Sequence, residues 1–223
     1  MRKNSEIRQE VRSLMKGNWG SAVGVTLVFL LITYAVVLAT TVVGMLFGQP
    51  VCEDGAEQSI VGQILSVLAI IFVVYPIVFG TVMLFLQFAR EGEKPRVGNL
   101  FKAFSSKYYG KSVGVYLLTS IFTSLWALLL IVPGIIKTLA YSLAPYILID
   151  NPELTANQAL NQSVKMMKGH KMQLCLMMLG YVGFTLLSVF ALCIPLLWIY
   201  PYYQAVLAKF YEEVKSNYTE TAC

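Results

Sequence analysis

Charge is scarce in this sequence of 223 residues: Lys, Arg, Asp and Glu together make up 13% of it, and histidine occurs once. The single His170 cannot build a typical metal site, which needs several His, Cys or acidic ligands close together. The sequence also has no glycine-rich phosphate-binding loop and no Gly-x-Ser-x-Gly nucleophile motif. We therefore expect no metal, no other cofactor and no enzymatic activity.

Acidic residues are absent from the long apolar stretches, and all 12 fall in loops, in tails or at the ends of stretches, as Asp150 does. Buried carboxylates are the usual mark of proton or sodium transport through a membrane, so a relay of that kind is not expected. The four cysteines are scattered along the chain. A disulfide between Cys52 and Cys193 is left open, because nothing in their spacing supports it.

Apolar residues are abundant instead, at 57% of the chain, which is more than a soluble domain of this length buries. The first apolar stretch is too long for the apolar region of a cleavable signal peptide. We predict a single membrane domain over 1–223 with the fold of an all-α, polytopic integral membrane protein. Its six predicted transmembrane helices form three hairpins, and they cover residues 20–47, 59–89, 113–132, 135–149, 172–194 and 195–208.

The positive charges form a simple map: 16 of the 17 Lys and Arg residues lie in segments 2–16, 90–111, 165–171 and 209–215. Because Lys and Arg favour cytoplasmic loops, all four segments belong on one side, and the N- and C-termini are predicted to be cytoplasmic. The stretches 135–149 and 195–208 are short for the ~30 Å of hydrocarbon. The map therefore fits six full crossings, which we favour, but also two crossings plus two hairpins that dip in from inside.

An amphipathic stretch precedes each hairpin, and helices of this kind lie in the headgroup plane. We predict interfacial helices over 1–17 and 154–168, the second with a capping box of Thr155 and Gln158, and a further stretch that carries Phe101, Phe104 and Tyr108. Anionic lipid of the inner leaflet is the expected partner, and nucleic acid is not. The predicted basic contacts are Arg8, Arg12, Lys16, Lys102, Lys107, Lys168 and Lys171.

Protein partners are a separate question. The exposed faces of the interfacial helices are an alternative docking site for a cytosolic protein. The pairs Gly20-x-x-x-Gly24 and Gly110-x-x-x-Gly114 allow close helix approach, either within one subunit, which we favour, or in a homo-oligomer.

Lys137 is the one basic residue outside the four segments, and it lies one turn after the break at Pro133-Gly134. In one interpretation its long stem snorkels to the outer headgroups. In the other, a cavity near Lys137, Tyr141 and Pro145 attracts an anionic solute or a lipid phosphate.

Several segments resemble a known bacterial family, called "domain of unknown function 975". They are Lys16-Gly-Asn-Trp-Gly20, Ile131-Val-Pro-Gly-Ile-Ile-Lys137, the run from Ala140 to Thr155, and Met166-Met-Lys-Gly-His170. The resemblance covers nearly the whole chain. It implies a multi-pass protein of the bacterial cell membrane, and it implies no activity.

Two functions follow as hypotheses. The first is a non-enzymatic protein that organises the membrane or binds a partner through its basic inner face. The alternative is a carrier or channel for a small or amphipathic solute, which would use the cavity near Lys137, Tyr141 and Pro145.

Overall fold

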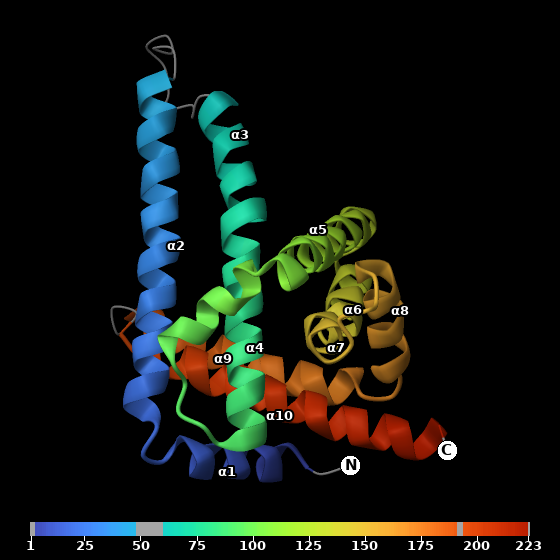
Figure 1. The fold of residues 1–223 in the computed structure, drawn as a ribbon. Coiled ribbons are helices and arrows are strands. Elements are labelled where there is room, and N and C mark those ends of the chain that lie inside the picture. The colour runs from blue at the N-terminus through green and yellow to red at the C-terminus, as the bar shows by residue number, and fades with distance from the viewer. Residues whose placement is uncertain (1–2, 48–59, 191–193, 223) are drawn as a thin grey trace.

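The computed structural model describes residues 3–47, 60–190 and 194–222, and every regular element within them is helical (Figure 1). In chain order these elements are α1 (Asn4–Met15), α2 (Trp19–Phe47), α3 (Ile60–Ala69), the π-helical turn η1 (Ile70–Val74), α4 (Tyr75–Glu91), the 3-10 helix η2 (Val97–Phe104), α5 (Ser106–Leu129), α6 (Ile131–Tyr141), α7 (Ala144–Asp150), α8 (Ala156–Met166), α9 (Lys171–Phe190) and α10 (Leu196–Ala222).

Five helical segments are long and apolar enough to cross a membrane: Trp19–Val43, Gln63–Glu91, Ser106–Leu129, Val132–Asp150 and Lys171–Ser188. The chain is therefore an all-helical, multi-pass membrane protein. The stretch 195–208, expected as a sixth crossing, is not among the five. It is the first half of α10, which runs for 27 residues into a charged second half, so its apolar part alone is too short.

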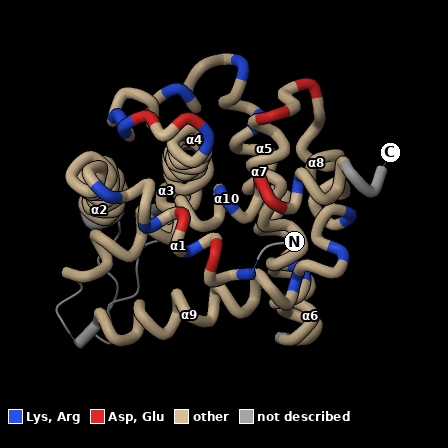
Figure 2. Tube along the Cα trace, turned by 90° about the horizontal axis from the view of Figure 1, so that it is seen from below, with Lys and Arg blue, Asp and Glu red and all other residues tan. Residues whose placement is uncertain are grey.

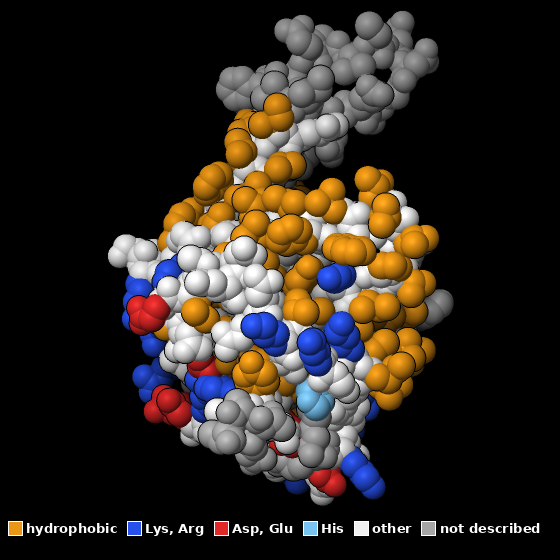
Figure 3. Space-filling model, turned by 90° about the vertical axis from the view of Figure 1, so that its right-hand side faces the viewer, with side chains coloured by type: hydrophobic (Ala, Val, Ile, Leu, Met, Phe, Trp, Pro, Cys, Tyr) orange, Lys and Arg blue, Asp and Glu red, His pale blue; other side chains and the backbone are white. Residues whose placement is uncertain are grey.

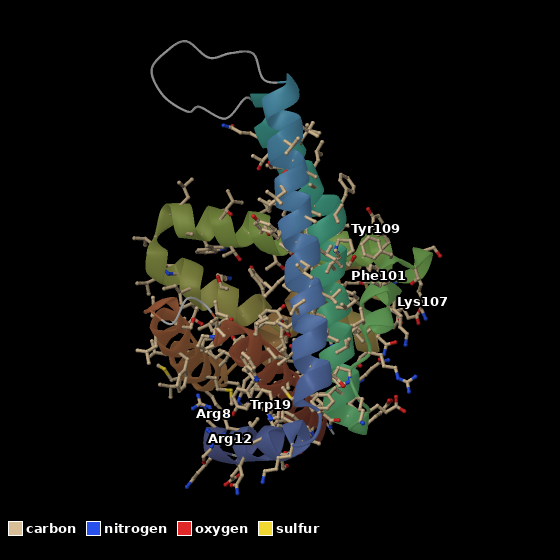
Figure 4. All side chains as sticks on the ribbon, turned by 90° about the vertical axis from the view of Figure 1, so that its left-hand side faces the viewer. Arg8, Arg12, Trp19, Phe101, Lys107 and Tyr109 are labelled. Atoms are coloured by element: carbon tan, nitrogen blue, oxygen red, sulfur yellow. The ribbon has the colours of Figure 1, made fainter. Side chains whose placement is uncertain are left out.

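The helices pair into three hairpins that point in different directions. Helix α2 packs against α3, α5 against α6, and α9 against α10. In Figure 4, α2 and the α3–α4 pair run upward, whereas the α5–α6 and α9–α10 hairpins lie to the left of them. The three hairpins thus fan out from a shared base and do not form a bundle of parallel crossings.

Charged and apolar surfaces are separated on the molecule. Figure 2 looks at the end where α1 lies and shows Lys, Arg, Asp and Glu positions on α1, α8, α10 and the end of α4. In Figure 3 the apolar side chains cover the upper and right-hand parts of the face, and most charged side chains lie across its middle, along its left side and at the bottom. The apolar side chains therefore lie mainly on the hairpins, and the charged side chains lie mainly near the base from which the hairpins start.

The apolar faces of α1 and α8 pack against the protein itself. In α1 the side chains of Ile7, Val11 and Met15 are fully buried, and α1 lies against α10. In α8, Ala159 and Leu160 are buried, and the capping box is present: the Thr155 N–H donates to Gln158 Oε1 at 2.9 Å. Both helices brace the hairpins, and their polar faces point outward.

The stretch before α5 behaves differently, because η2 has three residues per turn. This period places Leu100 and Ala103 toward α4, where both are buried, and leaves Phe101 and Phe104 exposed. A backbone contact sets this packing: a Cβ on Gly80 would overlap the Leu100 carbonyl oxygen. Only glycine at position 80 lets η2 lie this close to α4.

A Gly80→Ala substitution should lower the free energy of unfolding by about 1–3 kcal/mol, because the added methyl group forces η2 away from α4. Thermal unfolding of the purified protein in detergent, followed by tryptophan fluorescence, measures the change. Gly98→Ala is the matched control, since a Cβ on Gly98 meets nothing within 4 Å. Equal stability of the two variants would show that η2 does not depend on this contact.

Candidate functional site

The carboxylate of Asp150 lies at the base shared by the three hairpins and has three partners. Arg90 makes a bidentate pair, with Nη1 at 2.8 Å from Oδ1 and Nη2 at 2.8 Å from Oδ2. Tyr211 OH donates to Oδ2 at 2.8 Å, and Lys215 Nζ lies 2.6 Å from the same oxygen. The Asp150 side chain is only 9% exposed. An ionised carboxylate this well covered needs such partners.

A second acid completes this group of residues, which we call the Asp150 cluster: Arg90, Asp150, Tyr211, Glu212 and Lys215. Glu212 Oε1 accepts hydrogen bonds from Arg90 Nε at 2.9 Å and from Nη2 at 2.6 Å. Two cations and two carboxylates leave the cluster with no net charge. It joins the last turn of α4, the last residue of α7 and the second half of α10.

Tyr211 holds its proton firmly in this setting. Burial raises the pKa of the Tyr211 phenol well above its ordinary value, and the adjacent Asp150 carboxylate raises it further. The Tyr211 ring also stacks on Tyr146 of α7, with centroids 5.1 Å apart. The phenol therefore remains a hydrogen-bond donor to Asp150 across the physiological pH range.

The predicted cavity residues Lys137, Tyr141 and Pro145 occupy three different environments. Lys137 Nζ lies over the Trp126 ring of α5, 4.8 Å from its centroid. The Tyr141 ring contacts Phe122, with centroids 6.3 Å apart, and Pro145 is buried in the first turn of α7. The structure thus places Lys137 toward the α5–α6 turn and Pro145 beyond the end of α6.

Between α6 and α7 the helix is interrupted at Ser142 and Leu143, and Ser163 of α8 bridges the interruption. Ser163 Oγ donates to the Ala140 carbonyl at 2.6 Å and accepts from the Leu143 N–H at 3.2 Å. All of these groups are buried. The hydroxyl therefore pairs two backbone groups that would otherwise be left without partners away from water.

Most of the basic residues that were predicted to contact lipid have exposed side chains. The exposed ones are Arg12, Lys16, Lys102, Lys107 and Lys168, while Arg8 and Lys171 are half-buried. Arg8 lies against α9, with Nη2 3.1 Å from where a Cβ on Gly180 would be. Figure 4 shows Arg8, Arg12, Trp19, Phe101, Lys107 and Tyr109 along the lower and right-hand side of the fan.

Within the described part of the chain, no group of three or more His, Cys, Asp or Glu side chains is placed to hold a metal ion. The expectation of no cofactor stays a prediction. Cys52 and Cys193 lie outside the described residues, so the open question of their disulfide stays open.

Sequence reasoning missed the Asp150 cluster and the Ser163 bridge. The only signal was weak: Asp150 is a lone acid directly after an apolar stretch, and Ser163 lies on the apolar side of a predicted helix. Neither pattern names its partners, which lie 60 and 23 residues away in the chain.

Comparison with known proteins gives one result. A family model described as "Protein of unknown function (DUF975)" matches residues 1–140 and 128–218, which together span nearly the whole chain. The chain belongs to this family. No curated protein and no solved structure matches it. The resemblance noted in the sequence is thereby confirmed, and DUF975 membership by itself assigns no activity.

An Asp150→Asn substitution should lower the free energy of unfolding by about 2–4 kcal/mol, because it leaves Arg90 and Lys215 facing each other without a carboxylate between them. Thermal denaturation in detergent provides the readout. Glu153→Asn, at an exposed acid three residues later, is the matched control and should change little. If the control loses as much stability, the cluster has no special role.

A Ser163→Ala substitution should cost about 1–3 kcal/mol, since it strands the buried Ala140 carbonyl and Leu143 N–H. Hydrogen exchange should rise selectively at residues 140–145. Asn161→Ala on the exposed side of the same helix should leave both measurements unchanged. Unaltered exchange in the serine variant would contradict the bridging role.

Proposed function

We propose that this protein organises the membrane without enzymatic activity, by binding anionic lipid headgroups at a basic inner face. The face consists of Arg12, Lys16, Lys102, Lys107 and Lys168. Its location is the cytoplasmic side of a bacterial cell membrane, with both chain termini inside. One observation carries the proposal: these cations are exposed beside membrane-spanning helices, and among the described residues none of them pairs with an acid.

The ion pairs support the proposal, because the cations that pair with acids are not the cations of the basic inner face. Arg90 and Lys215 are neutralised in the Asp150 cluster, and Lys209 pairs with Glu10 at 2.8 Å, which fixes α1 to α10. With its apolar face buried, α1 presents Arg12 and Lys16 outward. Each cation close to an anionic membrane surface contributes about 1 kcal/mol of attraction.

Helix η2 adds an apolar component to the basic inner face. The Phe101 side chain is 50% exposed and Phe104 is 38% exposed, and Lys102 and Lys107 flank them. The two rings and Tyr109 form a row, with centroids 6.3 Å and 6.0 Å apart. Aromatic rings beside lysines are typical of side chains that sit at the headgroup level.

A second copy of the chain and a transported solute are the alternative partners. A Cβ on Gly20, Gly24 or Gly110 would meet no atom within 4 Å, and one on Gly114 would meet only Ala156 at 3.5 Å. Gly20, Gly24 and Gly110 therefore do not serve the intrasubunit packing that we favoured for the pairs, whereas Gly114 lies within van der Waals distance of α8. The carrier hypothesis stays a prediction. The helix interruption between Tyr141 and Pro145 is bridged by Ser163 and surrounded by buried residues.

Electron paramagnetic resonance with spin-labelled lipids tests the proposal in reconstituted bilayers. The immobilised fraction of phosphatidylglycerol should exceed that of phosphatidylcholine severalfold. In the variant R12Q/K16Q/K102Q/K107Q this preference should fall severalfold, because about 1 kcal/mol per cation corresponds to about fivefold in association and only Lys168 of the face remains. Raising the salt concentration should weaken the preference of the unaltered protein.

The double variant E91Q/E93Q is the control. It removes two exposed charges of the opposite sign, Glu91 at the end of α4 and Glu93 in the loop before η2, and leaves every cation in place, so the preference should persist. Equal immobilisation of the two lipids by the unaltered protein would overturn the proposal. A concentration-dependent dimer with no lipid preference would favour the homo-oligomer instead.

A further inference from the structure

We infer that the turn between α5 and α6 ends inside the lipid bilayer, where acyl chains of the outer leaflet cover it, and that it never reaches the outer water. We call residues 125–136 the apex. The second hairpin then enters and leaves the membrane on the inner side. This inference does not depend on headgroup binding by the basic inner face.

The side chains of the apex are the first argument. From Leu125 to Ile136 the sequence has no charged residue and no Ser, Thr, Asn or Gln. Leu128 is 88% exposed, Leu129 71% and Val132 66%, and no described part of the chain covers them. Contiguous exposed apolar surface of this kind is avoided in water and is normal in hydrocarbon.

The first hairpin provides the contrast. Its connecting segment, 48–59, contains Glu53, Asp54 and Glu57 with a glutamine at each side. Helix α2 has 29 residues, or ~43 Å at helical rise, which exceeds the ~30 Å of hydrocarbon. The first hairpin thus has both the length and the polar connection of a full crossing, and the apex has no such connection.

The backbone of the apex is also suited to lipid. A single residue, Leu130, separates α5 from α6. Its N–H donates to the Trp126 carbonyl at 3.0 Å, and its own carbonyl accepts from the Gly134 N–H at 3.2 Å. Gly134 allows the tight turn, because a Cβ there would lie 2.9 Å from Ala127 Cα. Chain inside a bilayer must pair its backbone groups internally, and Leu130 does so.

Lys137 fits the same placement. Side chains of a helix lean toward its N-terminus, so Lys137 leans toward the apex. Its ammonium ends over the Trp126 ring, 4.8 Å from the centroid. The Trp126 ring gives the ammonium a cation–π partner, and desolvation in hydrocarbon strengthens such a contact. The ring therefore takes the place of the headgroup in this hairpin.

Length and direction complete the argument. The returning arm, Val132–Asp150, has 19 residues, or ~28 Å at helical rise, and it is interrupted at Ser142 and Leu143. Even an upright arm that starts at the inner boundary would stop just short of the outer one. In Figure 4 the α5–α6 hairpin lies at a large angle to α2, so at least one of the two is strongly tilted.

Power-saturation electron paramagnetic resonance of a nitroxide at position 129 tests the inference in bilayers. The spin label is attached to a Leu129→Cys protein whose native cysteines are replaced by serine. Oxygen concentrates in hydrocarbon and a charged nickel chelate stays in water. We expect collisions with oxygen to exceed those with nickel severalfold at position 129, and the reverse for Lys102→Cys on the exposed side of η2.

Each result of this experiment either supports or overturns the location of the apex in lipid. Nickel collisions at position 129 equal to those at position 102 would place the apex in water and overturn the inference. Low accessibility to both reagents would mean that protein covers the apex, which also overturns it. Leu128→Cys serves as a second probe if the first variant fails to fold, as judged by gel filtration. Labelling of native Cys52 from outside in intact cells checks that the first hairpin crosses.

Discussion

The carboxylate of Asp150 constrains the whole molecule, because it holds residues of all three hairpins together at one point. Arg90 belongs to the first hairpin, Asp150 to the second, and Tyr211 and Lys215 to the third. Removing Arg90 or Lys215 from Asp150 would leave a carboxylate that is only 9% exposed and less well paired. Contacts farther along the hairpins add to this tie, such as the stacking of Phe29 of α2 on Tyr200 of α10, with centroids 5.4 Å apart, and the hydrogen bond between Tyr75 OH and Ser120 Oγ at 2.9 Å.

Helices α1 and α8 act mainly as braces. Helix α1 buries its apolar face against the third hairpin, and α8 contributes Ser163 to the interrupted helix of the second. Unlike α1 and α8, helix η2 presents exposed aromatic side chains, Phe101 and Phe104. An amphipathic pattern in a membrane protein therefore has two distinct outcomes, a face that packs on the protein and a face that is left for lipid. The exposed fractions distinguish them.

Properties that depend on local composition were predictable from the sequence. The apolar stretches and the capping box of Thr155 rest on neighbouring residues. Pro133-Gly134 marked the neighbourhood of the second hairpin's turn, but the turn lies at Leu130, and both residues belong to α6. The 3-10 form of η2, the pairing of Asp150 with Arg90 and the continuity of α10 through residue 208 do not rest on neighbouring residues. Each depends on a contact between distant segments or on a close backbone approach, as at Gly80, and a single sequence carries no direct signal of either.

The order of synthesis gives the Asp150 cluster a further consequence. A ribosome releases Arg90 first, then Asp150, and Tyr211 and Lys215 only near the end of the chain. Until α10 emerges, Arg90 is the only basic residue of the cluster that can balance Asp150, and the inner end of the second hairpin has no third helix to cover it. The cluster is therefore complete only after residues 211–215 have been made, when both other hairpins are already part of the chain.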